Sequence, residues 1–155
     1  MDKPQFVYVS YIQATPEKVW NALIDPEMTK QYWFNHHNKS DWNVGSRWEH
    51  QMYDDPSVVH IVGKVAESDP PRRLVVTWAR PGDEENEART SRVTYEIEPL
   101  ADSVKLTVTH DEFGADSEML ESVSFGWPVV ISGLKTLLET GKPLPTAAPG
   151  KSDCK

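Results

Sequence analysis

The chain has 155 residues, the length of one ordinary domain, which can bury a core without disulfides or metal ions. Its 16 basic and 24 acidic residues give a net charge of −8, which argues against a duplex nucleic-acid binder and against binding to an anionic membrane surface. Six tryptophans, five tyrosines and four phenylalanines supply ample area to bury, which argues against a disordered chain.

The sequence also limits the compartment and the domain organisation. Cys154 is the single cysteine, so neither an internal disulfide nor a thiolate zinc site is expected. The sequence contains no run of 18 apolar residues, so no membrane span is predicted. Residues 1–4 lack the pattern of a secretory signal. We therefore expect a cytoplasmic protein with one domain over residues 1–143 and a disordered tail over residues 144–155.

The first part of the chain predicts a strand, two short helices and a loop. Residues 6–12 are rich in aromatic and β-branched residues, as is typical of a strand. Thr15 is a good N-cap and Pro16 suits the first position of a helix that runs to residue 24. Asp25 can cap a second short helix over residues 27–32. Residues 33–43 are polar and aromatic, and we predict a loop there.

A run of strands follows. We predict them over residues 46–53, 58–67, 74–78, 92–98 and 104–110, with an acidic, exposed loop over residues 80–90. The last two strands each alternate a polar with an apolar face, and a short hairpin connection over residues 100–103 joins them. Such alternation is typical of an antiparallel sheet with one solvated side.

A long helix forms the last predicted element. Its apolar stripe has helical spacing and comprises Trp127, Val130, Ile131, Leu134, Leu137 and Leu138. Gly141 and Pro143 predict its end. A proline deep in a helix costs roughly 3 kcal/mol, so we expect Pro128 in the first turn and the helix to begin near residues 124–126. Residues 117–123 would then form a separate short helix or a kinked extension.

The order of these elements predicts an α+β fold. We expect a curved antiparallel sheet of about six strands wrapped around the long C-terminal helix, with two short helices after the first strand. The helix has one place to bury its apolar stripe, which is the concave face of that sheet.

Three stretches in this order resemble one known family. They are residues 14–23 with Asp25, Pro26 and Trp33; residues 63–65 leading to residues 70–74 and 77–78; and residues 126–128 followed by residues 134–141. Over residues 6–143 the chain resembles the activator-of-heat-shock-ATPase-like branch of the START-like (SRPBCC) superfamily. The resemblance implies the helix-grip fold, with an apolar cavity between the sheet and the helix. Members include lipid and hormone carriers, polyketide cyclases and a co-chaperone domain, so the family does not fix the function.

Few residues suit catalysis. The sequence has neither a nucleophile elbow nor a glycine-rich phosphate loop, so we expect no ATP binding and no cofactor. His36 and His37 are adjacent and cannot both face one ion without distorting the loop, and Glu49 points away from His50 on a strand, so we predict no metal site. His50 and His110 fall on faces with apolar neighbours and are the candidates for acid–base chemistry.

Inward-facing aromatic residues suggest a binding pocket. Such rings either fill the core or line a pocket for an apolar or aromatic ligand, and a sheet that grips a helix leaves volume that favours the pocket. The predicted ligand-binding residues are Trp48, His50, Trp78, Tyr95, His110, Trp127 and Ile131.

Two loops leave further alternatives open. Trp33 and Trp42 flank a segment that either gates the cavity, binds a partner, or is held in place by local packing. The acidic run over residues 83–87 is either a solvated loop tip or a docking patch for a basic surface of another protein.

These observations lead to three hypotheses of function. The first is a non-catalytic protein that binds a small apolar or aromatic molecule. The second is a co-chaperone-like interaction module that stimulates a separate chaperone ATPase, although such members usually carry an additional domain. The third is an enzyme of cyclase or hydrolase type that uses His50 or His110.

Overall fold

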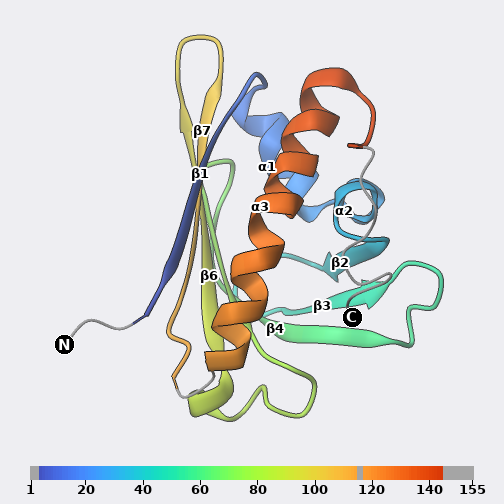
Figure 1. Ribbon diagram of the computed structural model, residues 1–155, viewed down its shortest axis with the longest axis vertical. Coiled ribbons are helices and arrows are strands. Elements are labelled where there is room, and N and C mark those ends of the chain that lie inside the picture. The colour runs from blue at the N-terminus through green and yellow to red at the C-terminus, as the bar shows by residue number, and fades with distance from the viewer. Residues whose placement is uncertain (1–3, 115–116, 145–155) are drawn as a thin grey trace.

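The computed structural model describes residues 4–114 and 117–144, which fold into a curved antiparallel sheet with helices on one face (Figure 1). The strands are β1 (Phe6–Ile12), β2 (His36–Ser40), β3 (Arg47–Met52), β4 (Val59–Asp69), β5 (Arg73–Trp78), β6 (Ser91–Pro99) and β7 (Val104–Asp111). The helices are α1 (Pro16–Ile24), α2 (Pro26–Tyr32), α3 (Ser117–Thr140) and the short 3-10 helix η1 (Glu87–Arg89).

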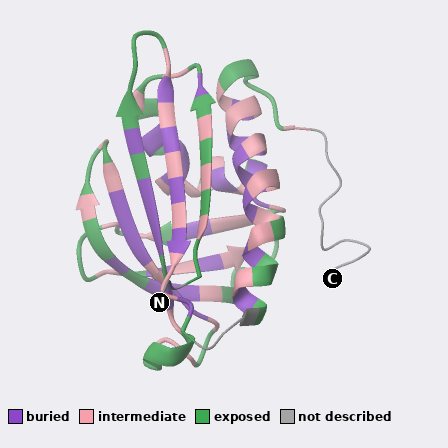
Figure 2. Ribbon diagram, turned by 60° about the vertical axis from the view of Figure 1, so that its left-hand side comes forward, coloured by how far each residue is buried: buried purple, intermediate pink, exposed green. Residues whose placement is uncertain are grey.

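The sheet has the strand order β1-β7-β6-β5-β4-β3-β2, so the first strand of the chain lies beside the last. Each neighbouring pair is antiparallel. Buried residues alternate along the strands and gather along one stripe of α3 (Figure 2). The predicted α+β class and the helix-grip arrangement are therefore confirmed.

The sheet has a seventh strand, β2, in a segment that we predicted to be a loop. The sequence His36–Ser40 has no apolar alternation, so its local pattern gives no sign of a strand. Pairing with β3 produces it, with Asn38 opposite His50. The side chain of Thr29 in α2 accepts a hydrogen bond from the backbone N–H of Asn38 at 3.0 Å. Long-range partners therefore decide this element.

The ends of the two short helices follow the predicted caps. The hydroxyl of Thr15 accepts a hydrogen bond from the backbone N–H of Lys18 at 3.2 Å. The carboxylate of Asp25 accepts one from the N–H of Glu27 at 2.9 Å. Each bond satisfies an N–H that the first turn of a helix leaves unpaired.

Our prediction for the start of the long helix is wrong. Helix α3 begins at Ser117 and carries Pro128 in its interior. Buried side chains before the proline, such as Met119 and Val123, and after it, such as Ile131, join the same core. Burying these side chains offsets the local cost of the proline, a tertiary effect that the sequence pattern does not report. The end of α3 is as predicted, because Gly141 has a φ of +81°.

Strand β4 allows an unusually close contact at Gly63. The indole N–H of Trp48 on β3 donates to the carbonyl of Thr77 on β5 at 2.7 Å, and Gly63 lies opposite Trp48. A Cβ on Gly63 would lie 1.9 Å from that carbonyl oxygen and 2.5 Å from the indole nitrogen. Only glycine leaves room for this bond.

No helix within residues 4–114 and 117–144 is long and apolar enough to cross a membrane. Apart from Leu144, the predicted tail, including Cys154, lies outside the described residues. The single-domain boundary at residue 143 stays a prediction.

Candidate functional site

The face of the sheet that meets α3 carries a continuous cluster of aromatic rings. Trp78 on β5 is its centre, with ring centroids 5.4 Å from Trp48 and 5.6 Å from Trp127. Trp33 packs on Trp127 at 5.4 Å, and Tyr95 packs on Trp127 at 6.0 Å. All five rings are buried. Most of the predicted inward-facing aromatic residues therefore meet one another rather than an open cavity.

His110 on β7 is locked into this cluster by hydrogen bonds. The indole N–H of Trp127 can only donate, so His110 Nδ1 accepts that bond at 3.1 Å. Its Nε2 then carries the proton and donates to Ser91 Oγ at 2.8 Å, and the Ser91 hydroxyl donates to the Trp78 carbonyl at 3.2 Å. Burial lowers the pKa of His110 to about 3. Both ring nitrogens form hydrogen bonds, so the neutral His110 ring connects Trp127 to Ser91.

His50 on β3 is likewise buried, and it belongs to a second group of histidines. The Asn38 side-chain oxygen accepts a bond from His50 Nδ1 at 2.6 Å. The His36 ring stacks on His50 at 4.6 Å, and His36 Nε2 lies 2.9 Å from Nδ1 of the exposed His60. Burial, together with nearby histidine charge, lowers the pKa of His50 well below its usual range. A β-bulge on β4 leaves His60 between two paired residues, which brings it to His36.

A hollow of about 140 Å³ lies where α3 meets the end of α2 and the strand β5. Its wall is formed by Trp33, Phe34, Trp78, Ser122, Val123, Gly126, Trp127 and Val130. An apolar cavity of about 150 Å³ is known to hold a benzene molecule. The hollow therefore has the volume for one aromatic ring, and it is far smaller than the roughly 300 Å³ at which pockets for drug-sized ligands begin.

The structure brings two of the seven predicted ligand-binding residues, Trp78 and Trp127, to the wall of this hollow. The other five do not line it: Trp48, His50, Tyr95, His110 and Ile131 are buried in the packing around it. Three larger hollows of 270, 460 and 610 Å³ elsewhere contain none of the seven. The small hollow is the candidate binding site, because aromatic and aliphatic side chains dominate its wall.

The sequence analysis missed five wall residues: Phe34, Ser122, Val123, Gly126 and Val130. Trp33 was recognised as an aromatic residue that could gate a cavity, and it lies in the wall while only 5% exposed. Phe34 has a φ of +52°, in the left-handed region, which no local pattern predicts. Gly126 carries no side chain, so only the packing of α3 shows that it faces open space.

Groups for catalysis or metal binding are sparse in this region. Within the described part of the chain, no three histidine, cysteine or carboxylate side chains are grouped so that they could hold a metal ion. None of the eight residues around the hollow is ionisable. The arrangement can hold an apolar group by packing, and it offers no charged group to transfer a proton there.

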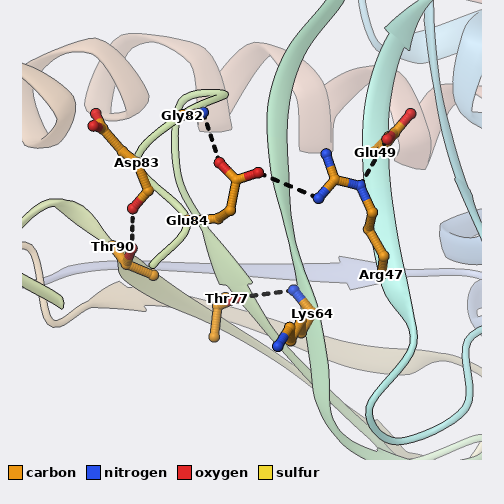
Figure 3. A network of polar contacts seen from close by, with 8 residues as sticks. All are labelled: Arg47, Glu49, Lys64, Thr77, Gly82, Asp83, Glu84 and Thr90. Atoms are coloured by element: carbon orange, nitrogen blue, oxygen red, sulfur yellow. Dashed lines mark hydrogen bonds and ion pairs between the residues drawn. The ribbon is translucent and has the colours of Figure 1, made fainter. Parts of the chain in front are cut away.

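The segment between Trp33 and Trp42 and the acidic loop over residues 80–90 differ in how far their side chains are exposed. Trp42 donates its indole N–H to the carbonyl of Ile24 at 3.0 Å, which holds the loop against α1. In the acidic loop, the carboxylate of Glu84 accepts bonds from the Gly82 N–H at 2.6 Å and from Arg47 on β3 at 3.3 Å (Figure 3). Glu85 in this loop remains exposed.

A curved antiparallel sheet closed by a long C-terminal helix, with a small aromatic hollow between them, defines a helix-grip protein. The sequence matches the family described as "Activator of Hsp90 ATPase homolog 1-like protein" over residues 13–139. The chain therefore belongs to this family, as its sequence motifs led us to expect. A comparison with proteins of curated function found no match.

Solved structures share the fold at low sequence identity. CalU16 from Micromonospora echinospora is 23% identical with a TM-score of 0.71, over 91% of this chain and 77% of that one. PFC0360w, described as an HSP90 activator from Plasmodium falciparum, is 22% identical with a TM-score of 0.71, over 86% of this chain and 95% of that one. The Aha1 dimer from Colwellia psychrerythraea is 20% identical with a TM-score of 0.68, over 90% and 98%. These similarities show the fold alone.

Proposed function

We propose that this protein binds a small apolar or aromatic molecule, without catalysis, in the hollow between the sheet and α3. The observation that carries the proposal is the hollow of about 140 Å³, whose wall includes three tryptophans and one phenylalanine. Flat rings bind other flat rings by offset or edge-to-face packing, and removal of their surface from water drives association. The hollow is smaller than pockets for drug-sized ligands, so it would take one ring of the ligand.

Gly126 gives a direct test, because it lines the hollow and a Cβ placed on it would meet no atom within 4 Å. Leucine at this position would occupy the hollow from the helix side. It would also favour the helix, since leucine has a better helix propensity than glycine by roughly 0.8 kcal/mol. Gly126→Leu is therefore expected to remain folded and to lose ligand binding.

The assay is a titration with toluene and with acetophenone, followed by NMR at the indole resonances of the three wall tryptophans. The matched control is Phe125→Leu, which places the same side chain one residue earlier, at a position 78% exposed. We expect binding to wild type and to the control, and at least a tenfold loss in Gly126→Leu. Equal binding to all three proteins, or shifts confined to other surfaces, would contradict the proposal.

Membership of the family favours a second candidate, stimulation of a separate chaperone ATPase. Trp33 is buried, so the exposed part of the acidic loop, with Glu85 and Glu87, is the better contact surface for a basic partner. The test measures ATP hydrolysis by an Hsp90-type chaperone with and without this protein. Stimulation that disappears in a Glu85→Lys, Glu87→Lys double variant would support this candidate, and an unchanged rate with wild type would exclude it.

A further inference from the structure

We infer, resting on the proposed function, that the ligand ring carries an uncharged hydrogen-bond acceptor and that the indole N–H of Trp78 donates to it. Two independent observations support this ligand class. Trp78 forms part of the wall of the hollow. Among the described residues, its Nε1 is a buried side-chain atom without a hydrogen-bond partner.

Nearby tryptophans show how this protein normally treats such a group. The indole N–H of Trp48 donates to a backbone carbonyl at 2.7 Å, that of Trp127 to His110 at 3.1 Å, and that of Trp42 to a backbone carbonyl at 3.0 Å. Buried donors in folded proteins are nearly always paired, because an unpaired one loses its bonds to water without replacement. An unpaired N–H on a residue that lines a binding hollow therefore points to an acceptor supplied by the ligand.

The wall also limits the charge and the size of the part of the ligand that enters the hollow. Since none of the wall residues is ionisable, a carboxylate or phosphate entering the hollow would lose its hydration with no opposite charge in the wall to replace it. A ketone, aldehyde or ether oxygen accepts a hydrogen bond without that penalty. The volume of about 140 Å³ limits the buried part to one ring with its substituent. The ligand class is therefore a neutral aryl carbonyl or aryl ether.

Phe34 is the side chain best placed to admit such a ligand. It is half-buried, and it borders both the 140 Å³ hollow and the neighbouring 270 Å³ hollow. Phe34 therefore has open space on two sides. Because Trp78 Nε1 is closed to water, the acceptor must enter between the wall rings, and a shift of Phe34 toward the larger hollow would make room.

The experiment compares acetophenone with α-methylstyrene, which have the same shape but differ in a carbonyl against a methylidene group. Dissociation constants of both are measured by NMR for wild type and for Trp78→Phe, which keeps an aromatic ring and removes the N–H. For each protein we take the ratio of the two affinities. Comparing this ratio between wild type and variant cancels the difference in hydrophobicity of the two molecules. A neutral hydrogen bond contributes roughly a fivefold gain in affinity, so we expect the ratio to fall about fivefold in the variant.

A second measurement uses only the wild-type protein, so it does not depend on the folding of a variant. In wild type, acetophenone should move the Trp78 indole proton downfield, and α-methylstyrene should not. If both molecules perturb the wall residues but leave that proton and the affinity ratio unchanged, the role of Trp78 is refuted and the proposed function stands. If neither molecule perturbs the wall residues, both proposals are overturned.

Discussion

Replacement of Gly63 by alanine tests how tightly the inner face of the sheet is built. The new Cβ would lie 1.9 Å from the carbonyl oxygen of Thr77 and 2.5 Å from Nε1 of Trp48, far closer than van der Waals contact. The strands β4 and β5 must separate, or the bond between Trp48 and Thr77 must break.

The expected loss of stability follows from these contacts. Forced overpacking costs about 1–3 kcal/mol, and an indole N–H left buried without its acceptor costs about 1–3 kcal/mol more. We therefore expect Gly63→Ala to lower the free energy of unfolding by about 2–6 kcal/mol, a large part of the roughly 5–15 kcal/mol of an ordinary domain.

Equilibrium unfolding in urea measures this change, with Gly126→Ala as the control. A Cβ on Gly126 meets no atom within 4 Å, so the same chemical change there should stabilise the protein by about 0.5–1 kcal/mol, because alanine favours the helix. A loss below about 1 kcal/mol in Gly63→Ala would show that the sheet relieves the close contact at Gly63 without cost, contrary to this prediction.

Three further predictions follow from other parts of the molecule. Because burial holds the pKa of His110 at about 3, against 6.5 in the unfolded chain, the unfolded state binds more protons between these values, and His110 alone should lower stability by about 1.4 kcal/mol per pH unit below pH 6.5. His50, whose pKa is also lowered by burial, adds to this loss in the same direction. Urea unfolding at pH 7 to 5 and ¹⁵N NMR of the imidazole check this, and a charged His110 at pH 5 would contradict it. Pro128→Ala should raise stability by about 1–3 kcal/mol in the same assay, since alanine restores an N–H to the carbonyl of Ser124; a decrease would show that the proline is needed. Glu84→Ala should speed hydrogen exchange at the Gly82 amide without moving the unfolding midpoint, and a lower midpoint would mean that the loop supports the core (Figure 3).

Local signals in the sequence account for most of the elements. The caps at Thr15 and Asp25, the stop at Gly141 and the alternation along β6 and β7 are each written into a few neighbouring residues. Their order specifies the α+β class, because a one-sided sheet and an amphipathic helix must bury their apolar faces against each other.

Local sequence signals predict less of the candidate site. Sequence periodicity correctly places Trp78 and Trp127 on inward faces, but it cannot show whether the space between them is filled. The bonds that lock His110 join residues 17 and 19 positions apart, and both its partners lie on other elements. His110, a candidate for acid–base chemistry from the sequence, therefore has a structural role that only its hydrogen-bond partners reveal.

The family, the types of most elements and the helix-grip class follow from the sequence alone, because motifs, helix caps, periodicity and turn residues each act over a few neighbouring positions. The tertiary structure decided the strand β2, the position of Pro128 within α3 and the size of the hollow. These depend on which distant side chains meet and how much volume they occupy, and a linear pattern of apolar and polar residues does not encode that volume.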